Sequence, residues 1–189
     1  ITTGEGGAVL TNNLDLSNKI KSMRNLGFNN TKRFFHENLY WNYRLGGLQA
    51  ALGLSQIKNL ENTIKLKTKQ GKIYQELLSK ENEFLETQLE TWNGVDNHYW
   101  VFGVNLKIPM IRDLVMSDLF EKGIETRPFF WPLHLQPGLP EEFQNSINNL
   151  TVSEKVGNDG LYIPIGGHIN VKKQKLIVKE LIESIKQYV

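Results

Sequence analysis

The strongest hydrophobic pattern of the chain lies between residues 45 and 78. Its apolar positions recur at intervals of three, four or seven residues: Ile57, Leu60, Ile64, Gly71, Tyr74 and Leu78. This spacing places them on one face of a helix, and the pattern predicts one long helix over residues 45–78. Its first part, LGGLQAALGLSQI, is apolar nearly all round and rich in small residues. That composition suits either a core helix or a helix at a subunit interface.

Weaker patterns precede this helix. Residues 6–13, GGAVLTNN, predict a short strand that follows a tight glycine turn. A short helix capped by Asp15 or Ser17 is expected next, ending near residue 25. Residues 28–44 carry aromatic side chains without a steady period, which predicts an ordered, contact-making loop.

The pattern changes after residue 78. The expected elements are a polar break at 79–98, a strand at 99–106, a helix at 111–123, strands at 124–130 and 161–165, and a last helix capped by Asn170. This order of strand, helix, strand, strand and helix predicts a small α/β layer with its own core. A domain boundary is expected between residues 60 and 95.

Composition and charge exclude several classes of function. The 189 residues carry a net charge of +2, too small to favour a nucleic-acid or membrane partner. The lysines at 65, 67 and 69 and at 172, 173 and 175 are interpreted as solvated helix faces. The chain has no cysteine, which excludes thiolate chemistry and suits the cytoplasm. The four histidines lack metal-ligand spacing and no catalytic triad is recognisable, so neither a metal site nor a hydrolase is expected.

Two candidate sites precede or begin the long helix. The turn Thr-Gly-Glu-Gly-Gly at residues 3–7 lets backbone N–H groups approach a ligand, although it matches neither the P-loop nor the dinucleotide fingerprint. A tight strand-entry turn is the alternative. Asn42 and Arg44 offer an amide and a planar guanidinium suited to phosphate or carboxylate, next to the N–H groups of a helix start. The alternative is a capping Asn followed by a solvated Arg.

A third candidate is the segment ETRPFFWPLHLQP, residues 125–137. Its three prolines stiffen the backbone, and its aromatic residues offer stacking surfaces. His134 adds a polar side chain that can act as a hydrogen-bond donor. A rigid, aromatic, sparsely polar loop suits a flat or sugar-like ligand, and hydrophobic core with an exposed histidine is the alternative.

Taken in order, ITTGEGGAVLTNN, RNLGF, NYRLGGLQAALGLSQI, GIETRPFFWPLHLQP and LYIPIGG resemble the DegT/DnrJ/EryC1/StrS sugar aminotransferases over essentially the whole chain. The resemblance implies an α/β fold, the C-terminal part of a pyridoxal-phosphate-dependent transferase of fold type I. Residues 1–60 would end the large, cofactor-binding domain with a dimer-contacting loop and helix, 61–95 form the connecting helix and linker, and 96–189 form the small domain. ITTGEGG with ETRPFF is most similar to the perosamine-synthase branch, which transfers an amino group from glutamate to a 4-keto-6-deoxy nucleotide sugar.

The resemblance also implies roles for individual residues in cofactor binding. Asn42 would reach across a homodimer to the cofactor phosphate of the neighbouring subunit, and Arg44 would lie near substrate or phosphate. Thr3 and Gly4 would lie in the turn against the cofactor lysine. That Schiff-base lysine is expected upstream of Ile1, so the chain itself contributes no catalytic residue, and the fragment alone is expected to be inactive. The alternatives are a nucleotide-sugar dehydratase with histidine in place of the lysine, and a non-catalytic sugar-nucleotide-binding or dimerisation fragment.

For the substrate, the resemblance places His134 in the nucleotide-sugar pocket. Arg127 and Trp131, on the same segment, are candidates for contact with the diphosphate or the base. Trp41 departs from the family, where a smaller residue is more common, and this departure leaves the substrate class open. The expected cofactor is pyridoxal 5'-phosphate, and the expected partners are a nucleotide sugar, glutamate and a second copy of the chain.

Overall fold

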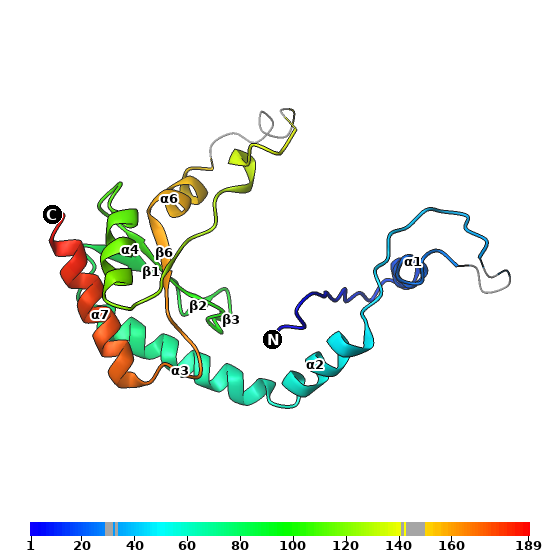
Figure 1. Ribbon diagram of the computed structural model, residues 1–189, viewed down its shortest axis with the longest axis horizontal. Coiled ribbons are helices and arrows are strands. Elements are labelled where there is room, and N and C mark those ends of the chain that lie inside the picture. The colour runs from blue at the N-terminus through cyan, green and yellow to red at the C-terminus, as the bar shows by residue number, and fades with distance from the viewer. Residues whose placement is uncertain (29–31, 33, 141, 143–149) are drawn as a thin grey trace. The chain divides into compact units, whose positions relative to one another are not determined.

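The computed structural model describes residues 1–28, 32, 34–140, 142 and 150–189. These residues form two compact units, Ile1–Glu61 and Asn62–Val189, whose elements are labelled in Figure 1. Over the described ranges, no helix is long and apolar enough to cross a membrane.

The first unit contains helix α1, Leu14–Arg24, and helix α2, Gly47–Ile57. Helix α1 ends where the sequence predicted, but neither Asp15 nor Ser17 is its cap. Asn13 takes that position, because its backbone is extended (φ −84°, ψ 117°) and its Oδ1 accepts a hydrogen bond of 2.9 Å from the N–H of Leu16.

The strand predicted for GGAVLTNN is absent. Residues 6–11 adopt no regular structure, and the side chains of Val9 and Leu10 are exposed. A strand exists only where a neighbour satisfies its N–H and C=O groups, and no segment within the described parts of the chain pairs with this one. The apolar pattern alone was therefore insufficient to form it.

The single helix predicted over residues 45–78 is two helices, α2 and α3, with α3 spanning Leu60–Leu78. At the break, the N–H of Asn59 bonds to the carbonyl of Gln56 at 3.0 Å, three residues back rather than four. The backbone therefore tightens into a 3₁₀-type turn. Asn has a low helix propensity, which agrees with a break at this position.

The second unit is built on a four-stranded antiparallel sheet with the order β1-β4-β6-β5. Its strands are β1 (Leu85–Thr87), β4 (Phe102–Leu106), β6 (Gly160–Ile163) and β5 (Arg127–Pro128). Leu85 lies opposite Leu106, Phe102 opposite Ile163, and Arg127 opposite Tyr162. The strands predicted at 99–106, 161–165 and 124–130 are thus present but shorter. Strand β5 is short partly because Pro128 has no N–H to donate.

The region predicted as a polar break, residues 79–98, contains β1 and a two-stranded hairpin. The hairpin pairs β2 (Thr91–Trp92) with β3 (Val95–Asp96). Asn93 and Gly94 connect them with positive φ values of 49° and 79°. An Asn-Gly pair between short β-type runs is a strong hairpin signal, so this element was predictable and was overlooked.

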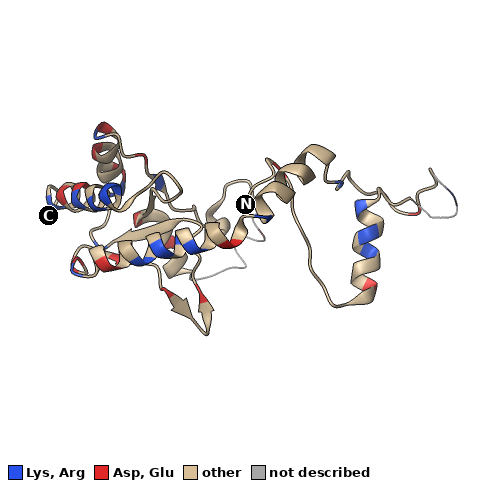
Figure 2. Ribbon diagram, turned by 90° about the horizontal axis from the view of Figure 1, so that it is seen from below, with Lys and Arg blue, Asp and Glu red and all other residues tan. Residues whose placement is uncertain are grey.

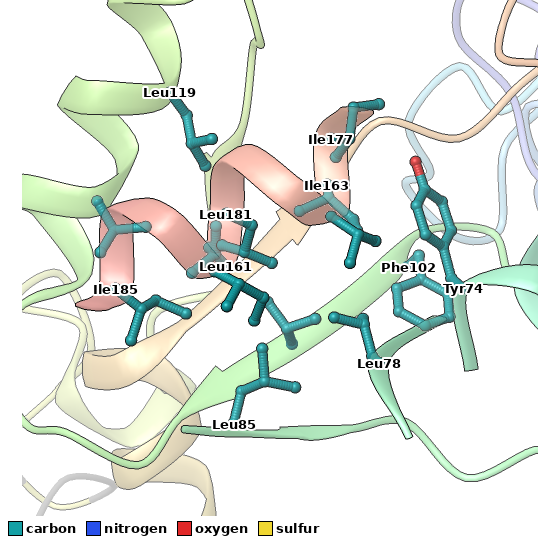
Figure 3. Close-up of a cluster of buried hydrophobic side chains, with 14 of the residues drawn as sticks. Tyr74, Leu78, Leu85, Phe102, Leu119, Leu161, Ile163, Ile177, Leu181 and Ile185 are labelled. Carbon is teal, nitrogen blue, oxygen red and sulfur yellow. The ribbon is translucent and has the colours of Figure 1, made fainter. Parts of the chain in front are cut away.

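The core lies on one face of the sheet, beneath helices α3, α4 (Arg112–Glu121) and α7 (Val171–Lys186) (Figure 3). Phe102, Val104 and Leu106 alternate along β4 toward this core. Their neighbours Gly103 and Asn105 face the opposite side, where helix α6 (Thr151–Asp159) packs against the sheet. The sheet therefore has a fully buried face and a second face that carries α6 and the 125–137 segment.

Both strongly patterned helices of this unit are confirmed. Helix α4 ends in a Schellman motif, in which Gly123 has φ +74° and the N–H of Ile124 bonds to the carbonyl of Leu119 at 2.8 Å. Helix α7 is capped by Asn170, as predicted, through a 3.0 Å bond from the N–H of Lys173. Helix α6 has no counterpart among the predicted elements.

Charges of both signs are spread over the helices other than α2, which has no charged residue (Figure 2). Lys65 and Lys69 are exposed, as predicted. Lys67 is not a solvated side chain: its Nζ donates to the carbonyls of Tyr99 and Trp100 at 3.2 and 2.7 Å. Burial lowers the pKa of Lys67. This lysine therefore holds the chain segment that precedes β4.

Replacing Asn170 by alanine is expected to destabilise the chain by about 1 kcal/mol, because the N–H of Lys173 loses its acceptor. Asn170→Asp is the matched control, since it keeps an oxygen acceptor at the helix N-terminus. It is expected to leave the free energy of unfolding nearly unchanged. Urea unfolding measures both free energies. Equal losses in the two variants would contradict a capping role for Asn170.

Candidate functional site

The first candidate group, Asn42 and Arg44, closes the loop between α1 and α2. Oδ1 of Asn42 accepts a hydrogen bond of 3.1 Å from the N–H of Arg44. The guanidinium of Arg44 donates to Oδ1 of Asn25 at 2.7 Å, and its central carbon lies 5.9 Å from the centroid of the Phe28 ring. These contacts tie the end of the loop to its beginning and fix the direction of the Asn42 amide.

The same group retains several hydrogen-bond donors. Within the described residues, the amide nitrogen of Asn42 has no protein partner, and Arg44 has further N–H groups beyond the one bound to Asn25. Gly46 provides no capping side chain, and the first intrahelical bond of α2 comes from the N–H of Ala50. The N–H groups of the first turn therefore have no intrahelical acceptor, and no capping side chain in the described part of the chain binds them. An amide, a guanidinium and a helix N-terminus form a donor set that fits a phosphate such as that of pyridoxal phosphate.

The opening turn is ordered by its own side chains. Oγ1 of Thr3 donates to the carbonyl of Glu5 at 2.8 Å, and the N–H of Gly4 donates to Oγ1 of Thr2 at 3.3 Å. Gly4 has φ +79°, which side-chain-bearing residues rarely adopt. At Gly6 a Cβ would lie 2.5 Å from Oγ1 of Thr3. The glycines therefore serve a compact turn whose threonine hydroxyls form hydrogen bonds within the turn.

The second candidate group lies in the other unit, on the segment that leaves β5. Arg127 is exposed and lies 3.5 Å from Glu125, and the indole N–H of Trp131 donates to the carbonyl of Leu135 at 3.2 Å. His134 lies in a 3₁₀ turn, Leu133–Leu135, and is only 6% exposed. Its Nε2 lies 2.9 Å from Oε1 of Glu154 on α6. The histidine is thus neither exposed nor free, and the structure gives these three residues separate polar partners.

Four aromatic rings line the sheet face beside this segment. Trp100 and Phe130 are stacked, with centroids 5.8 Å apart and planes at 9°, although Trp100 remains 74% exposed. Phe129 and Phe130 also contact the ring of Tyr162 on β6. Phe129 and Phe130 were candidates from the sequence, whereas Trp100 and Tyr162 were missed. No local signal marks those two: Tyr162 reaches the segment by pairing opposite Arg127, and Trp100 reaches it by stacking on Phe130.

Two cavities border the sheet in this unit. One, of about 600 Å³, has Trp100, Arg127 and Tyr162 among its lining residues. The other, of about 440 Å³, lies beside α6 and is lined by Gly103 and Asn105 among others. Oδ1 of Asn105 is buried there, with no hydrogen-bond partner among the described residues. The surface of this unit therefore offers concave, partly aromatic space beside Arg127, whereas Trp131 and His134 line neither of these two cavities.

The architecture is that of a known class of protein. The chain superposes on Helicobacter pylori PseC, described as an aminotransferase involved in the biosynthesis of pseudoaminic acid, with a TM-score of 0.82. The alignment covers 99% of this chain and 50% of PseC at 23% identity, so the likeness concerns the fold. The predicted fold class, part of a fold type I pyridoxal-phosphate-dependent aminotransferase, is confirmed.

Residues 1–182 match the model of the DegT/DnrJ/EryC1/StrS aminotransferase family, and the chain belongs to that family. The predicted resemblance is thereby confirmed.

Two relatives illustrate the match. The chain is 31% identical over 166 residues to GDP-perosamine synthase of Caulobacter vibrioides, and the alignment covers 87% of this chain and 44% of the relative. It is 34% identical over 139 residues to GDP-perosamine synthase of Vibrio cholerae, covering 72% and 37%. The chain thus spans less than half the length of these relatives.

Proposed function

We propose that this chain is the C-terminal part of a cytoplasmic, pyridoxal-phosphate-dependent aminotransferase. The enzyme transfers an amino group from glutamate to a 4-keto-6-deoxy nucleotide sugar. The single observation that carries the proposal is the donor set at the start of α2, where the amide nitrogen of Asn42, beside Arg44, has no partner among the residues that the structure describes. The similarity to GDP-perosamine synthases supports the choice of substrate.

In this proposal the cofactor supplies the electron sink for amino-group transfer when it is bound. The chain contributes positioning: Asn42, Arg44 and the first turn of α2 bind the phosphate, and the turn around Thr3 and Gly4 adjoins the cofactor lysine. The 125–137 segment binds the substrate, with Arg127 toward the diphosphate and Trp131 toward the base. His134, held by its contact with Glu154, is proposed to contact the same substrate.

The active site is proposed to be shared between two copies of the chain. Helix α2, which the structure describes in full, has Gly53 as its one buried residue and exposes large side chains such as Leu48, Leu54 and Ile57. So much exposed apolar surface on one helix is unfavourable in water and suits an interface. A closed homodimer would place this surface between the subunits.

Cofactor titration of the holoenzyme tests the role of Asn42. Asn42→Asp keeps the acceptor for the N–H of Arg44 but replaces the free donor with a negative charge. We expect pyridoxal phosphate to bind at least about tenfold more weakly, since a hydrogen bond to a charged group contributes about 1.5–3 kcal/mol. Asn38→Asp, in the same loop, is the charge-matched control. Equal weakening in both variants, or in neither, would contradict the proposal.

Product analysis and mixing tests separate the remaining alternatives. The holoenzyme with glutamate and a GDP-4-keto-6-deoxy sugar is expected to yield a 4-amino sugar. A deoxygenated sugar without nitrogen would indicate the dehydratase, and no product with any keto sugar nucleotide would indicate a binding fragment. Asn42→Ala and cofactor-lysine→Ala subunits, each inactive alone, are expected to regain activity when mixed. Absence of recovery would rule out a shared site.

A further inference from the structure

The side chain of Gln56 makes a paired contact with the opening turn. Its Oε1 accepts a hydrogen bond of 2.9 Å from the N–H of Thr2, and its Nε2 donates to the carbonyl of the same residue. The two residues are 54 positions apart in the sequence. The Gln56 amide therefore satisfies both backbone polar groups of Thr2, as one rung of a β-ladder does.

The geometry of Gln56 is itself fixed by its helix. Its Nε2 lies 3.3 Å from the carbonyl of Leu52, one turn earlier in α2. A glutamine free in solvent samples many rotamers, and ordering it costs conformational entropy. The bond to Leu52 holds the amide in position for Thr2.

The next residue of the turn lies against the same face of α2. A Cβ on Gly53 would lie 3.0 Å from Cγ2 of Thr3, so the absence of a side chain there permits close approach. Positions 53 and 56 are three residues apart and are neighbours on the helix surface. Thr2 is thus hydrogen-bonded to Gln56, and Thr3 packs against Gly53 on the same face of the helix.

We infer that Gln56 is a positioning residue: together with Gly53 it orients the Thr2–Gly4 turn on α2. Because both polar groups of the Thr2 backbone are bound, the direction in which the chain enters Thr2 is fixed as well. The inference rests on the proposed function, in which this turn adjoins the cofactor lysine. Gln56 does not touch the reacting atoms, and it acts through the backbone of Thr2.

Hydrogen exchange of the 189-residue chain tests the contact of the Thr2–Gly4 turn with Gln56 directly, without any cofactor. Gln56→Met preserves an unbranched side chain of similar length but removes both hydrogen bonds to Thr2. We expect the amides of residues 2–7 to exchange at least about tenfold faster, the factor that corresponds to losing about 1.4 kcal/mol. Lys58→Met, at the C-terminal cap of α2, is the control and is expected to leave their exchange unchanged. Unchanged exchange in Gln56→Met would overturn the inference.

A pH titration of the holoenzyme tests whether the contact between Gln56 and the Thr2–Gly4 turn affects the cofactor lysine. The readout is the pH midpoint of the visible absorbance band of the lysine-bound cofactor, which a loss of stability alone does not move. We expect Gln56→Met to shift this midpoint by about 0.5 pH unit or more, roughly a threefold change in proton affinity. Gly53→Ala, which displaces Thr3 while Gln56 remains, is expected to shift the midpoint as well. Lys58→Met is expected to leave the midpoint unchanged.

An unshifted midpoint in both Gln56→Met and Gly53→Ala, despite faster exchange, would overturn the positioning role. A wild-type holoenzyme without the absorbance band would instead refute the proposed function. In that case the exchange measurement still decides whether Gln56 holds the turn.

Discussion

Replacing Gly71 by alanine is expected to destabilise the second unit by about 3 kcal/mol. A Cβ at this position of α3 would lie 2.2, 2.3 and 2.6 Å from three carbons of the Tyr99 ring. Tyr99 is only 2% exposed and stacks on Phe102 with a centroid distance of 5.6 Å, so the ring has no free space to enter. The close approach of this ring to the helix backbone requires glycine at position 71.

The magnitudes of two opposing effects decide the sign of this prediction. Alanine is better than glycine in a helix interior by about 1 kcal/mol, which favours the substitution. Displacing a buried aromatic ring costs about 3–5 kcal/mol when its packing is lost, and overpacking alone costs about 1–3 kcal/mol. Packing therefore outweighs propensity, although propensity alone predicts stabilisation.

Urea unfolding of matched variants tests this balance. Gly138→Ala is the control, because no described residue has an atom within 4 Å of a Cβ at that position. Its free energy of unfolding is expected to stay within about 0.5 kcal/mol of that of the parent chain. Adding Tyr99→Leu to Gly71→Ala is expected to recover part of the loss, since the smaller side chain leaves room for the methyl group. Strictly additive effects of the two substitutions would show that the ring is not the obstacle.

Replacing Gln70 by leucine is expected to cost about 3 kcal/mol of unfolding free energy. The Nε2 of Gln70 donates to the carbonyls of Gly166 and Ile169 at 2.7 and 2.6 Å, and its Oε1 accepts from the N–H of Gly166 at 3.2 Å. Leucine has a similar volume but leaves these groups without their partner. A buried polar group that loses its partner costs about 1–3 kcal/mol, and the partly exposed groups of Gly166 regain some hydration.

The control for Gln70→Leu is Gln187→Leu, at the exposed C-terminal cap of α7. Its free energy of unfolding is expected to lie within about 0.5 kcal/mol of that of the parent chain. Hydrogen exchange locates the effect: amides of the segment between β6 and α7 should lose protection in Gln70→Leu only. Unaltered protection there would indicate that Gln70 does not hold this segment.

Helices with a strong hydrophobic period were the most predictable elements. Helices α4 and α7 follow the expected intervals, and Gly123 and Asn170 mark a helix end and a helix start. These signals are local, since the residues that form a helical turn and its cap lie within about four positions of one another. The same local signals did not reveal the break at Asn59, because hydrophobic spacing continues across it.

Strands were less predictable, because a strand depends on a distant partner. GGAVLTNN has an apolar pattern but no partner within the described residues, and it forms no strand. Strand β1, by contrast, escaped prediction in a polar stretch and forms because Leu85 and Thr87 pair with β4.

For the candidate sites, the sequence by itself determined the residue chemistry and the family. The donors of Asn42 and Arg44, the glycine turn after Thr3 and the aromatic segment around Trp131 are properties of short stretches. Only the tertiary structure decided which groups remain available. It paired His134 with Glu154, stacked Trp100 on Phe130 and seated Thr2 on Gln56. These contacts join residues that are 20, 30 and 54 positions apart in the sequence. The chemistry of a side chain specifies what a residue can bind, but the folding of the chain specifies which groups lie close enough to be bound.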